Sequence, residues 1–174
     1  MITAYVASAG GLQRLTLPSG AAIPENAIWL DLLEPSLEEE TRVEKALGQD
    51  VPTREEMQEI EVSSRLYTAG EASFMTATVL SQTDTATPQS SAITFILTRR
   101  CLVSLRYADP KPFALFANRI CKQAGLGSSS EIVLVGLLEA VVDRLADILE
   151  KLSNDLDSLS HAIFAEDQDR KSVV

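Results

Sequence analysis

The chain has 174 residues, of which 45% are hydrophobic, and a formal net charge of −10. Its mean hydropathy is +0.07. This composition can bury one sizeable core and excludes a largely disordered chain. The longest apolar stretches, such as residues 92–97 and 132–138, fall far short of the roughly 20 residues that cross a bilayer, and no signal-peptide pattern opens the chain.

The negative charge gathers in two regions. Residues 34–61 carry ten acidic and three basic side chains, and residues 131–174 carry ten and four. The intervening residues 62–130 have a balance of +4. Acidic surfaces of this kind repel polyanions and attract cations, so we expect no nucleic-acid partner.

The first part of the chain has the pattern of short strands. Residues 2–7 and 12–17, joined through Gly10 and Gly11, predict a hairpin. Residues 27–32 predict a third strand, which ends before Pro35.

Two acidic helices are expected next. Ser36 with Glu39 three positions later is a capping box, and it predicts a helix over residues 36–47 that ends near Gly48. Thr53 begins a second, shorter pattern of the same kind, which predicts a helix over residues 53–60.

The middle of the chain returns to strands. Their β-branched and aromatic residues predict an antiparallel meander, followed by a helix from Phe113 to about Ala124. The four predicted strands are residues 65–68, 74–82, 91–98 and 102–107. Helices on both sides of the strand block predict an α+β fold: an αβα layered domain with a mixed, largely antiparallel sheet, followed by a long C-terminal helix. We therefore expect two domains, residues 1–130 and 131–174.

The most informative feature is an apolar repeat with alternating spacings of three and four, called the heptad seam below. Its members are Val135, Leu138, Val142, Leu145, Leu149, Leu152, Leu156, Leu159 and Ile163. The repeat predicts one helix over residues 131–164, about 50 Å long at 1.5 Å per residue. Such a helix needs a partner helix, either from a second copy or from a segment beyond Val174, so we expect the chain to be the soluble part of something longer. A helix lying across its own domain is the alternative.

The sequence holds no arrangement typical of an active site, and we expect the protein not to be an enzyme. His161 is the only histidine and lies on the polar face of the predicted long helix. Cys101 and Cys121 lack metal-ligand spacing and read as buried reduced thiols.

Carboxylates on the outward face of the long helix are the main candidate site. Asp143, Asp147 and Glu150 follow each other at spacings of four and three, which places them on one helix face. Hard divalent cations prefer oxygen ligands, so this face predicts a weak metal site. A solvated polar face is the alternative interpretation.

Several motifs together resemble one family. They are Trp29-Leu30-Asp31-Leu32 followed by Pro35, then Pro52-Thr53 leading into Ile60-Glu61-Val62-Ser63-Ser64-Arg65, then Thr94-Phe95-Ile96-Leu97 and Leu102-Val103-Ser104-Leu105-Arg106-Tyr107. In order and spacing they resemble the cytoplasmic domain of CorA-type magnesium channels, and the resemblance extends over nearly the whole chain. The family's pore helix and Gly-Met-Asn motif would lie beyond Val174, so membrane contact would come only through that missing segment.

The resemblance implies a homopentameric channel of the inner membrane, with this domain on its cytoplasmic face and soluble when isolated. Divalent cations bound between subunits would hold the channel closed, as a regulatory ligand that binds the isolated domain weakly. The helical carboxylates would act with one from the α/β domain, for which Asp84 and Asp109 are the loop candidates. Mg²⁺ is the expected ion, with Zn²⁺ and Co²⁺ as alternatives.

Other functions stay open at this point. A ZntB-like zinc transporter has the same architecture. A soluble adaptor could use the heptad seam to bind partners, and the isolated chain is expected to self-associate through it. An enzyme that acts on a small molecule is the third alternative function.

Overall fold

The structure is a computed structural model, and it describes residues 1–59, 61, 65–85, 87–123 and 125–171, without the side chains of 162 and 164–171. Two compact units divide the chain, Met1–Ala140 and Val141–Val174, and each is described by itself. The division into domains at residue 130 stays a prediction.

In the part of the chain that the structure describes, seven strands form one sheet. They are β1 (Ile2–Ser8), β2 (Gly11–Leu17), β3 (Ala27–Leu33), β4 (Leu66–Ala69), β5 (Ala72–Ser81), β6 (Gln89–Leu97) and β7 (Leu102–Arg106). The helices are α1 (Leu37–Leu47), the single 3₁₀ turn η1 (Glu56–Gln58), α3 (Lys111–Ile120) and α4 (Ser130–Lys171).

The strand order is β2-β1-β3-β7-β6-β5-β4. The predicted hairpin and the predicted meander are both antiparallel, whereas β3 and β7 pair in parallel. This junction joins the first strands to the meander and makes the sheet mixed. The α+β prediction is confirmed.

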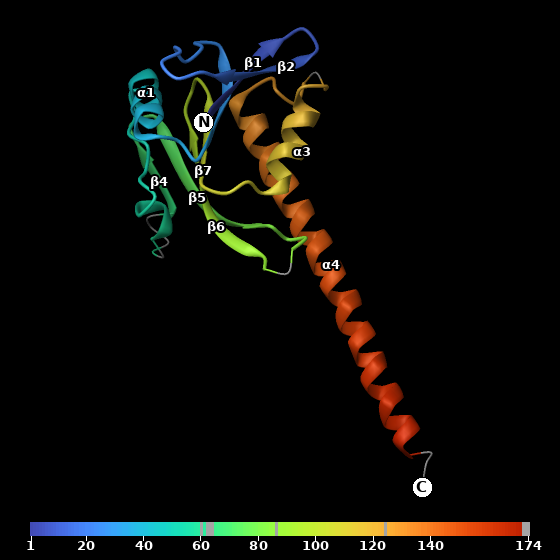
Figure 1. Cartoon of the computed structure of the whole chain (residues 1–174). Coiled ribbons are helices and arrows are strands. Elements are labelled where there is room, and N and C mark those ends of the chain that lie inside the picture. The colour runs from blue at the N-terminus through green and yellow to red at the C-terminus, as the bar shows by residue number, and fades with distance from the viewer. Residues whose placement is uncertain (60, 62–64, 86, 124, 172–174) are drawn as a thin grey trace. The chain divides into compact units, whose positions relative to one another are not determined.

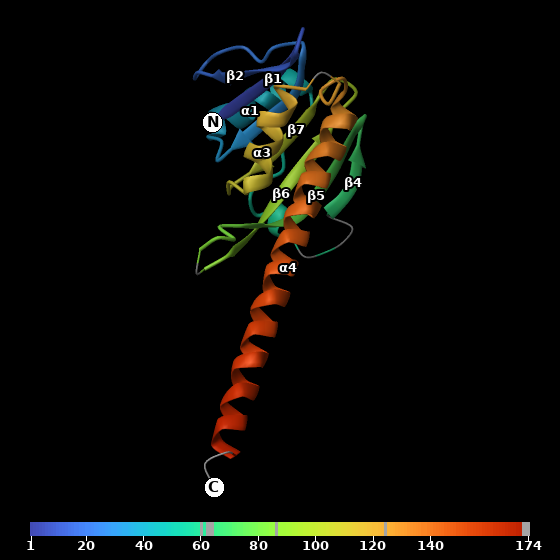
Figure 2. The same cartoon turned by 90° about the vertical axis from the view of Figure 1, so that its right-hand side faces the viewer.

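Helices cover both faces of the sheet, as Figures 1 and 2 show for α1 and α3. Val43 of α1 and Met57 of η1 are buried in one apolar cluster with Leu30, Val103 and other residues of that sheet face. On the opposite face, Phe113 of α3 belongs to an aromatic cluster with strand residues. The acidic helical segments and α3 therefore lie on opposite sides of the sheet, which is the predicted αβα layering.

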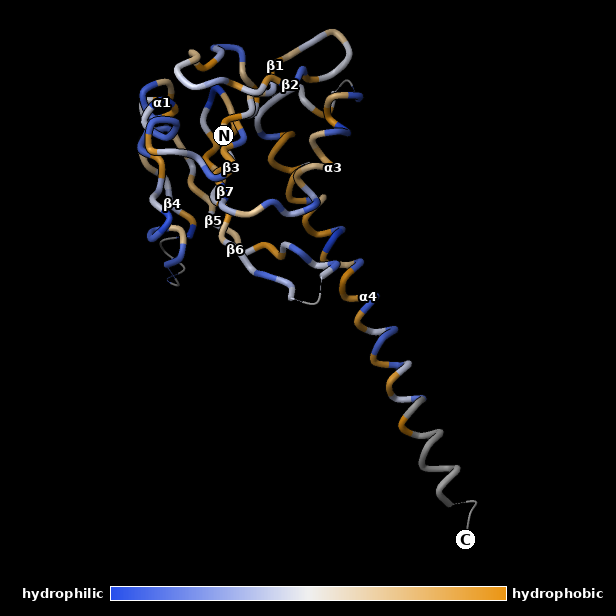
Figure 3. Tube along the Cα trace, in the orientation of Figure 1, coloured by the Kyte–Doolittle hydropathy of each residue, from blue (hydrophilic) through white to orange (hydrophobic). Residues whose placement is uncertain are grey.

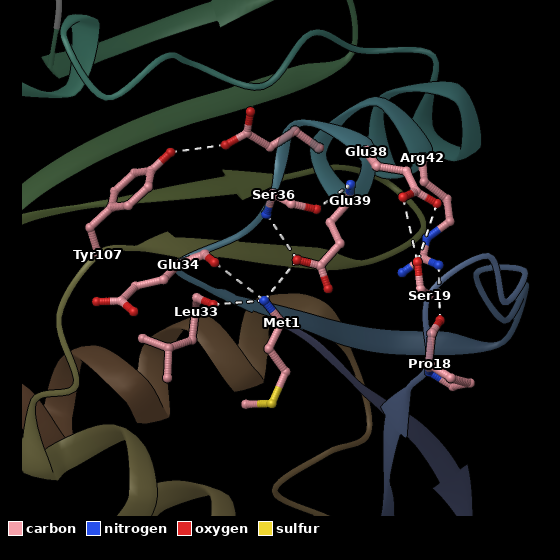
Figure 4. Close-up of polar contacts among 11 residues, drawn as sticks. Met1, Pro18, Ser19, Leu33, Glu34, Ser36, Glu38, Glu39, Arg42 and Tyr107 are labelled. Carbon is pink, nitrogen blue, oxygen red and sulfur yellow. Dashed lines mark hydrogen bonds and ion pairs between the residues drawn. The ribbon is translucent and has the colours of Figure 1, made fainter.

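The predicted capping box is present at the start of α1 (Figure 4). Glu39 N–H donates to the Ser36 hydroxyl, and Ser36 N–H donates to the Glu39 carboxylate. The same carboxylate accepts from the α-amino group of Met1 at 2.8 Å. Partial burial opposes ionisation, but these donors hold the pKa of Glu39 below its usual value. Gly48, in the left-handed conformation, ends the helix as predicted.

The predicted helix over residues 53–60 is wrong in length. Among the described residues 53–59, only Glu56–Gln58 form a helical turn, of the 3₁₀ type. Thr53 and Glu56 make the expected reciprocal bonds, yet these satisfy just the first backbone groups. Burial of Met57 stabilises this one turn. Helix formation is cooperative, and a single turn is too short to extend itself. Residue 60, the last of the predicted helix, lies outside the described residues.

A polar network runs through the aromatic face of the sheet. Trp29 Nε1 donates to the Ser104 hydroxyl at 2.9 Å, and that hydroxyl donates to Asp31 at 2.7 Å. Arg106 donates to both oxygens of Asp31 through Nε and Nη2, at 2.9 and 2.8 Å. Both charged side chains of this pair are only 7% exposed. The ring of Phe113 covers the guanidinium, with its centroid 4.7 Å away.

The long helix is confirmed as one continuous element, α4. Its first turns, within the first unit, bury Val133, Leu134 and Leu137. Gly136 is needed there, because a Cβ would lie 2.4 Å from the ring of Phe116. The residues buried in these turns are thus not those of the heptad seam.

Most of the heptad seam is exposed. Val135 and Leu138 are 54% and 38% exposed in the first unit. In the second unit the exposed members range from 52% to 66%: Val142, Leu149, Leu152, Leu156, Leu159 and Ile163. Figure 3 shows the alternation of apolar and polar residues along the helix. A row of this length without cover is typical of an interaction surface.

The burial of Trp29 is testable by fluorescence. Trp29 is 0% exposed and stacks on Tyr5 with ring centroids 4.1 Å apart. We expect acrylamide to quench its emission far less than that of free tryptophan, because the quencher cannot reach a covered indole. The chain unfolded in guanidinium is the control, and equal quenching before and after unfolding would contradict the placement.

The ion pair of Arg106 with Asp31 is testable by mutation. Asp31→Asn leaves the guanidinium buried without its main counter-charge, which should lower the free energy of unfolding by about 3 kcal/mol. Denaturation in urea measures the change. Asp50→Asn, at an exposed position, is the matched control and should stay within about 0.5 kcal/mol. A loss below about 1 kcal/mol for Asp31→Asn would show that the pair is not a central support.

Candidate cation-binding carboxylates

The helical candidates Asp143, Asp147 and Glu150 are all exposed in the second unit. Within the helix, Arg144 Nη1 lies 3.9 Å from Asp147. Stacked at intervals of one turn, these carboxylates can offer a cation two or three oxygen ligands. Magnesium needs six ligands in an octahedron and surrenders its waters reluctantly, so one such face makes an incomplete site.

Asp109, a loop candidate, lies between β7 and α3 and is bound to the buried guanidinium. Arg106 Nη1 donates to its Oδ1 at 2.6 Å and to the carbonyl oxygen of Ala108 at 3.0 Å. Burial alone would lower the pKa of Arg106, but its bonds to Asp31 and Asp109 raise it. Asp109 is therefore part of the polar network as well as a surface carboxylate.

Asp84, the other loop candidate, lies in the turn between β5 and β6 and forms an ion pair with Lys111. The turn is held by Thr85, whose N–H and hydroxyl both donate to the Gln82 carbonyl oxygen. Lys111 is the first residue of α3, two positions after Asp109. Both loop candidates thus contact bases near the start of one helix.

No preformed metal centre exists within the described residues, because no three His, Cys, Asp or Glu side chains lie close enough to hold an ion. The candidates provide hard oxygen donors, which suit Mg²⁺, but in separate and incomplete sets. Any site built from them needs further ligands.

Among the side chains that the structure describes, the remaining reactive groups do not form a catalytic arrangement. His161 is exposed on α4. Cys101 is buried, as expected, whereas Cys121 is only half-buried. Burial raises the pKa of both thiols. A hollow of about 240 Å³ lies beside Tyr107. Burial and the bond from its hydroxyl to Glu40 raise the pKa of Tyr107 to about 12, so it is a poor proton donor.

Sequence reasoning missed the bases that hold the loop carboxylates. Arg106 and Asp31 both belong to the strand motifs, but the two residues are 75 positions apart in the sequence. A signal did exist, because a charged residue within each of two apolar strands predicts a buried pair. Nothing local marks Lys111 as the partner of Asp84.

Comparison with protein families and curated proteins gives consistent matches. The protein-family model described as "CorA-like Mg2+ transporter protein" matches residues 24–174. Magnesium transport protein CorA of Escherichia coli K12 is 28% identical over 163 residues, covering 94% of this chain and 51% of that protein. CorA of Salmonella typhimurium gives the same figures. The chain thus spans about half the length of the curated relatives it matches.

Solved structures share the fold. The soluble domain of CorA from Methanocaldococcus jannaschii has a TM-score of 0.71 at 15% identity, over 95% of this chain and 65% of that one. The cytoplasmic domain of ZntB from Vibrio parahaemolyticus has a TM-score of 0.63 at 13% identity, over 90% of this chain and 63% of that one.

In the described part of the chain, no helix is both long and apolar enough to cross a bilayer. The family model, by contrast, covers most of the chain, from residue 24 to residue 174. By that match, the chain belongs to the CorA-like Mg²⁺ transporter family.

Proposed function

We propose that the chain is the cytoplasmic, cation-sensing domain of a CorA-like magnesium channel in the inner membrane. The observation that carries the proposal is the division of the candidate ligands. Among the described residues, these carboxylates lie on α4 in one unit and on loops of the α/β unit, and neither set brings three possible ligands together. Such half-sites are what a cation bound between neighbouring subunits requires.

The proposed mechanism is thermodynamic linkage. If Mg²⁺ bridges carboxylates of adjacent subunits only in the closed arrangement, rising internal Mg²⁺ favours that arrangement by its differential binding energy. Couplings between sites are typically about 1–3 kcal/mol. When Mg²⁺ is removed, the acidic faces repel and the closed arrangement loses its support. No catalytic residue is needed.

The proposed assembly is a homopentamer. The exposed apolar residues of the heptad seam extend over several turns of α4. Such a surface supports packing against another helix, either in an oligomer or from a further segment. In the isolated chain this surface would be covered by a second copy. Within the longer protein, its cover would come from a neighbouring helix.

The donor chemistry favours Mg²⁺ over Zn²⁺. Zinc sites usually contain cysteine or histidine, whereas the candidate ligands here are all carboxylates. The structural likeness to a ZntB cytoplasmic domain keeps zinc transport as the second candidate. The exposed seam keeps a third, an adaptor that binds a partner helix.

The cation response is testable on α4. We expect calorimetry of the isolated chain with Mg²⁺ to show little heat, because one subunit binds at millimolar strength or weaker. The assembled transporter should instead gain thermal stability with Mg²⁺, and the double variant Asp143→Asn, Asp147→Asn should lose most of that gain. The exposed pair Glu25→Gln, Asp50→Asn changes the net charge equally and is the control. If the double variant of α4 kept the full gain in thermal stability with Mg²⁺, the acidic face of α4 would be a solvated surface without a role in cation binding.

Self-association through the seam is a separate test. Sedimentation of the isolated chain at tens of micromolar should show dimers or larger species, and Leu149→Gln with Leu156→Gln should shift them to monomer. Leu115→Gln, an exposed leucine on α3, should leave the distribution unchanged. A wild-type chain that sediments only as monomer would contradict the expected role of the seam.

A further inference from the structure

The hollow of about 240 Å³ beside Tyr107 has polar side chains without a protein partner. Its polar side chains are Arg54, Gln58 and Ser90, and its apolar ones are Met57, Ala92 and Tyr107. Within the described residues, none of the three polar side chains forms a hydrogen bond or an ion pair. No described carboxylate lines the hollow, although the whole chain has a net charge of −10. The hollow therefore offers hydrogen-bond donors and one positive charge.

The hollow lies beyond the carboxyl end of β7, at the parallel junction of the sheet. Tyr107 directly follows β7, and Ala92 directly precedes Ile93, the first residue of β6 that pairs with β7. After β3 the chain continues into α1 on one face, and after β7 it continues into α3 on the other (Figure 1). Where neighbouring parallel strands of an open sheet connect to opposite faces, ligands bind outside their carboxyl ends. The fold therefore places the hollow where such sheets bind ligands.

Strand alternation indicates which hydroxyl of β6 faces the hollow. Ala92 packs against the apolar cluster that contains Met57 of η1. Ser90 lies two positions before Ala92 and shares its side of the sheet, whereas Ser91 has the opposite side. The hydroxyl of Ser90 is thus on the same side of the sheet as η1, which also contains Gln58.

Arg54 supplies the positive charge. Its guanidinium lies over the ring of Tyr107, with Cζ 5.0 Å from the ring centroid. A guanidinium stacked on a ring keeps its in-plane N–H donors, and two of these match the oxygens of a carboxylate. The hydroxyl of Tyr107 donates to Glu40 at 2.9 Å (Figure 4). The ring therefore offers a ligand an apolar surface and no further proton.

Charge and size indicate the class of ligand. One base balances one negative charge, and Glu40 and Glu55 are close enough to Tyr107 to repel a second. A carboxylate carries one charge at pH 7, whereas a phosphate monoester carries nearly two. Pockets for drug-sized ligands measure about 300–1,000 Å³, so this hollow suits a smaller molecule.

We propose that this hollow binds a small organic acid that has one carboxylate and one hydroxyl group. Arg54 holds the carboxylate. Gln58 and Ser90 bond the hydroxyl group, and the hydrocarbon part lies against the ring of Tyr107. None of these side chains is a candidate cation ligand, so the inference goes beyond the proposed function and does not depend on it.

Lactate is the probe, because it has one carboxylate, one hydroxyl group and one methyl group. Titration of the 174-residue chain at constant ionic strength should shift the NMR signals of the Gln58 side-chain amide and the Ser90 backbone amide. For a ligand of this size we expect a dissociation constant on the order of millimolar. Arg54→Gln should weaken binding about ten-fold, because it removes a charge-assisted hydrogen bond.

Arg119→Gln is the matched control. Its guanidinium also lies over a ring, that of Phe116 at 5.4 Å, but it belongs to α3 on the opposite face of the sheet. This variant should bind lactate as the wild type does. Ser90→Ala should weaken the binding of lactate and leave that of acetate, which has no hydroxyl group, unchanged.

Three results would overturn the inference. Lactate could shift these signals no more than the same concentration of chloride, which would show that the hollow has no site for the acid. Arg54→Gln could bind lactate as tightly as Arg119→Gln, which would remove the proposed role of the guanidinium. Orthophosphate could bind more tightly than lactate, which would contradict the assignment of a singly charged carboxylate.

Discussion

The buried ion pair of Arg106 with Asp31 supports the whole α3 side of the sheet. Two charges removed from water need each other, so they fix β7 against β3 at the parallel junction of the sheet. Arg106 is also the last residue of β7, and it holds the following loop through Ala108 and Asp109. That loop leads directly into α3. The pair therefore places the start of this helix, and with it Lys111.

Local signals made much of the fold predictable. The capping box at Ser36, the C-terminal Gly48 and the alternation of the meander each lie within a few residues, and the structure has them as expected. The length of the helix at η1 was overestimated, because a capping pattern indicates where a helix begins but not how far it continues. The polar network and the bases of the loop carboxylates depend on residues far apart in sequence, which no local pattern could pair.

The long helix shows the same limit. Its apolar repeat correctly predicted one continuous element, but periodicity identifies an apolar face and not what covers it. In the first turns the chain buries Val133, Leu134 and Leu137, while Val135 and Leu138 of the heptad seam stay exposed. Both sets have helical spacing. Packing against Phe116, which requires Gly136, decides between them, and that contact is tertiary.

We propose that the incomplete sets of carboxylates become a cation site only where subunits meet. Anomalous diffraction from crystals of the assembled transporter grown with Mn²⁺ tests it most directly, because manganese accepts the same oxygen donors as magnesium. We expect a peak between Asp84 or Asp109 of one subunit and Asp143, Asp147 or Glu150 of its neighbour. Peaks bound by the carboxylates of a single subunit, or no peak at these side chains, would contradict it.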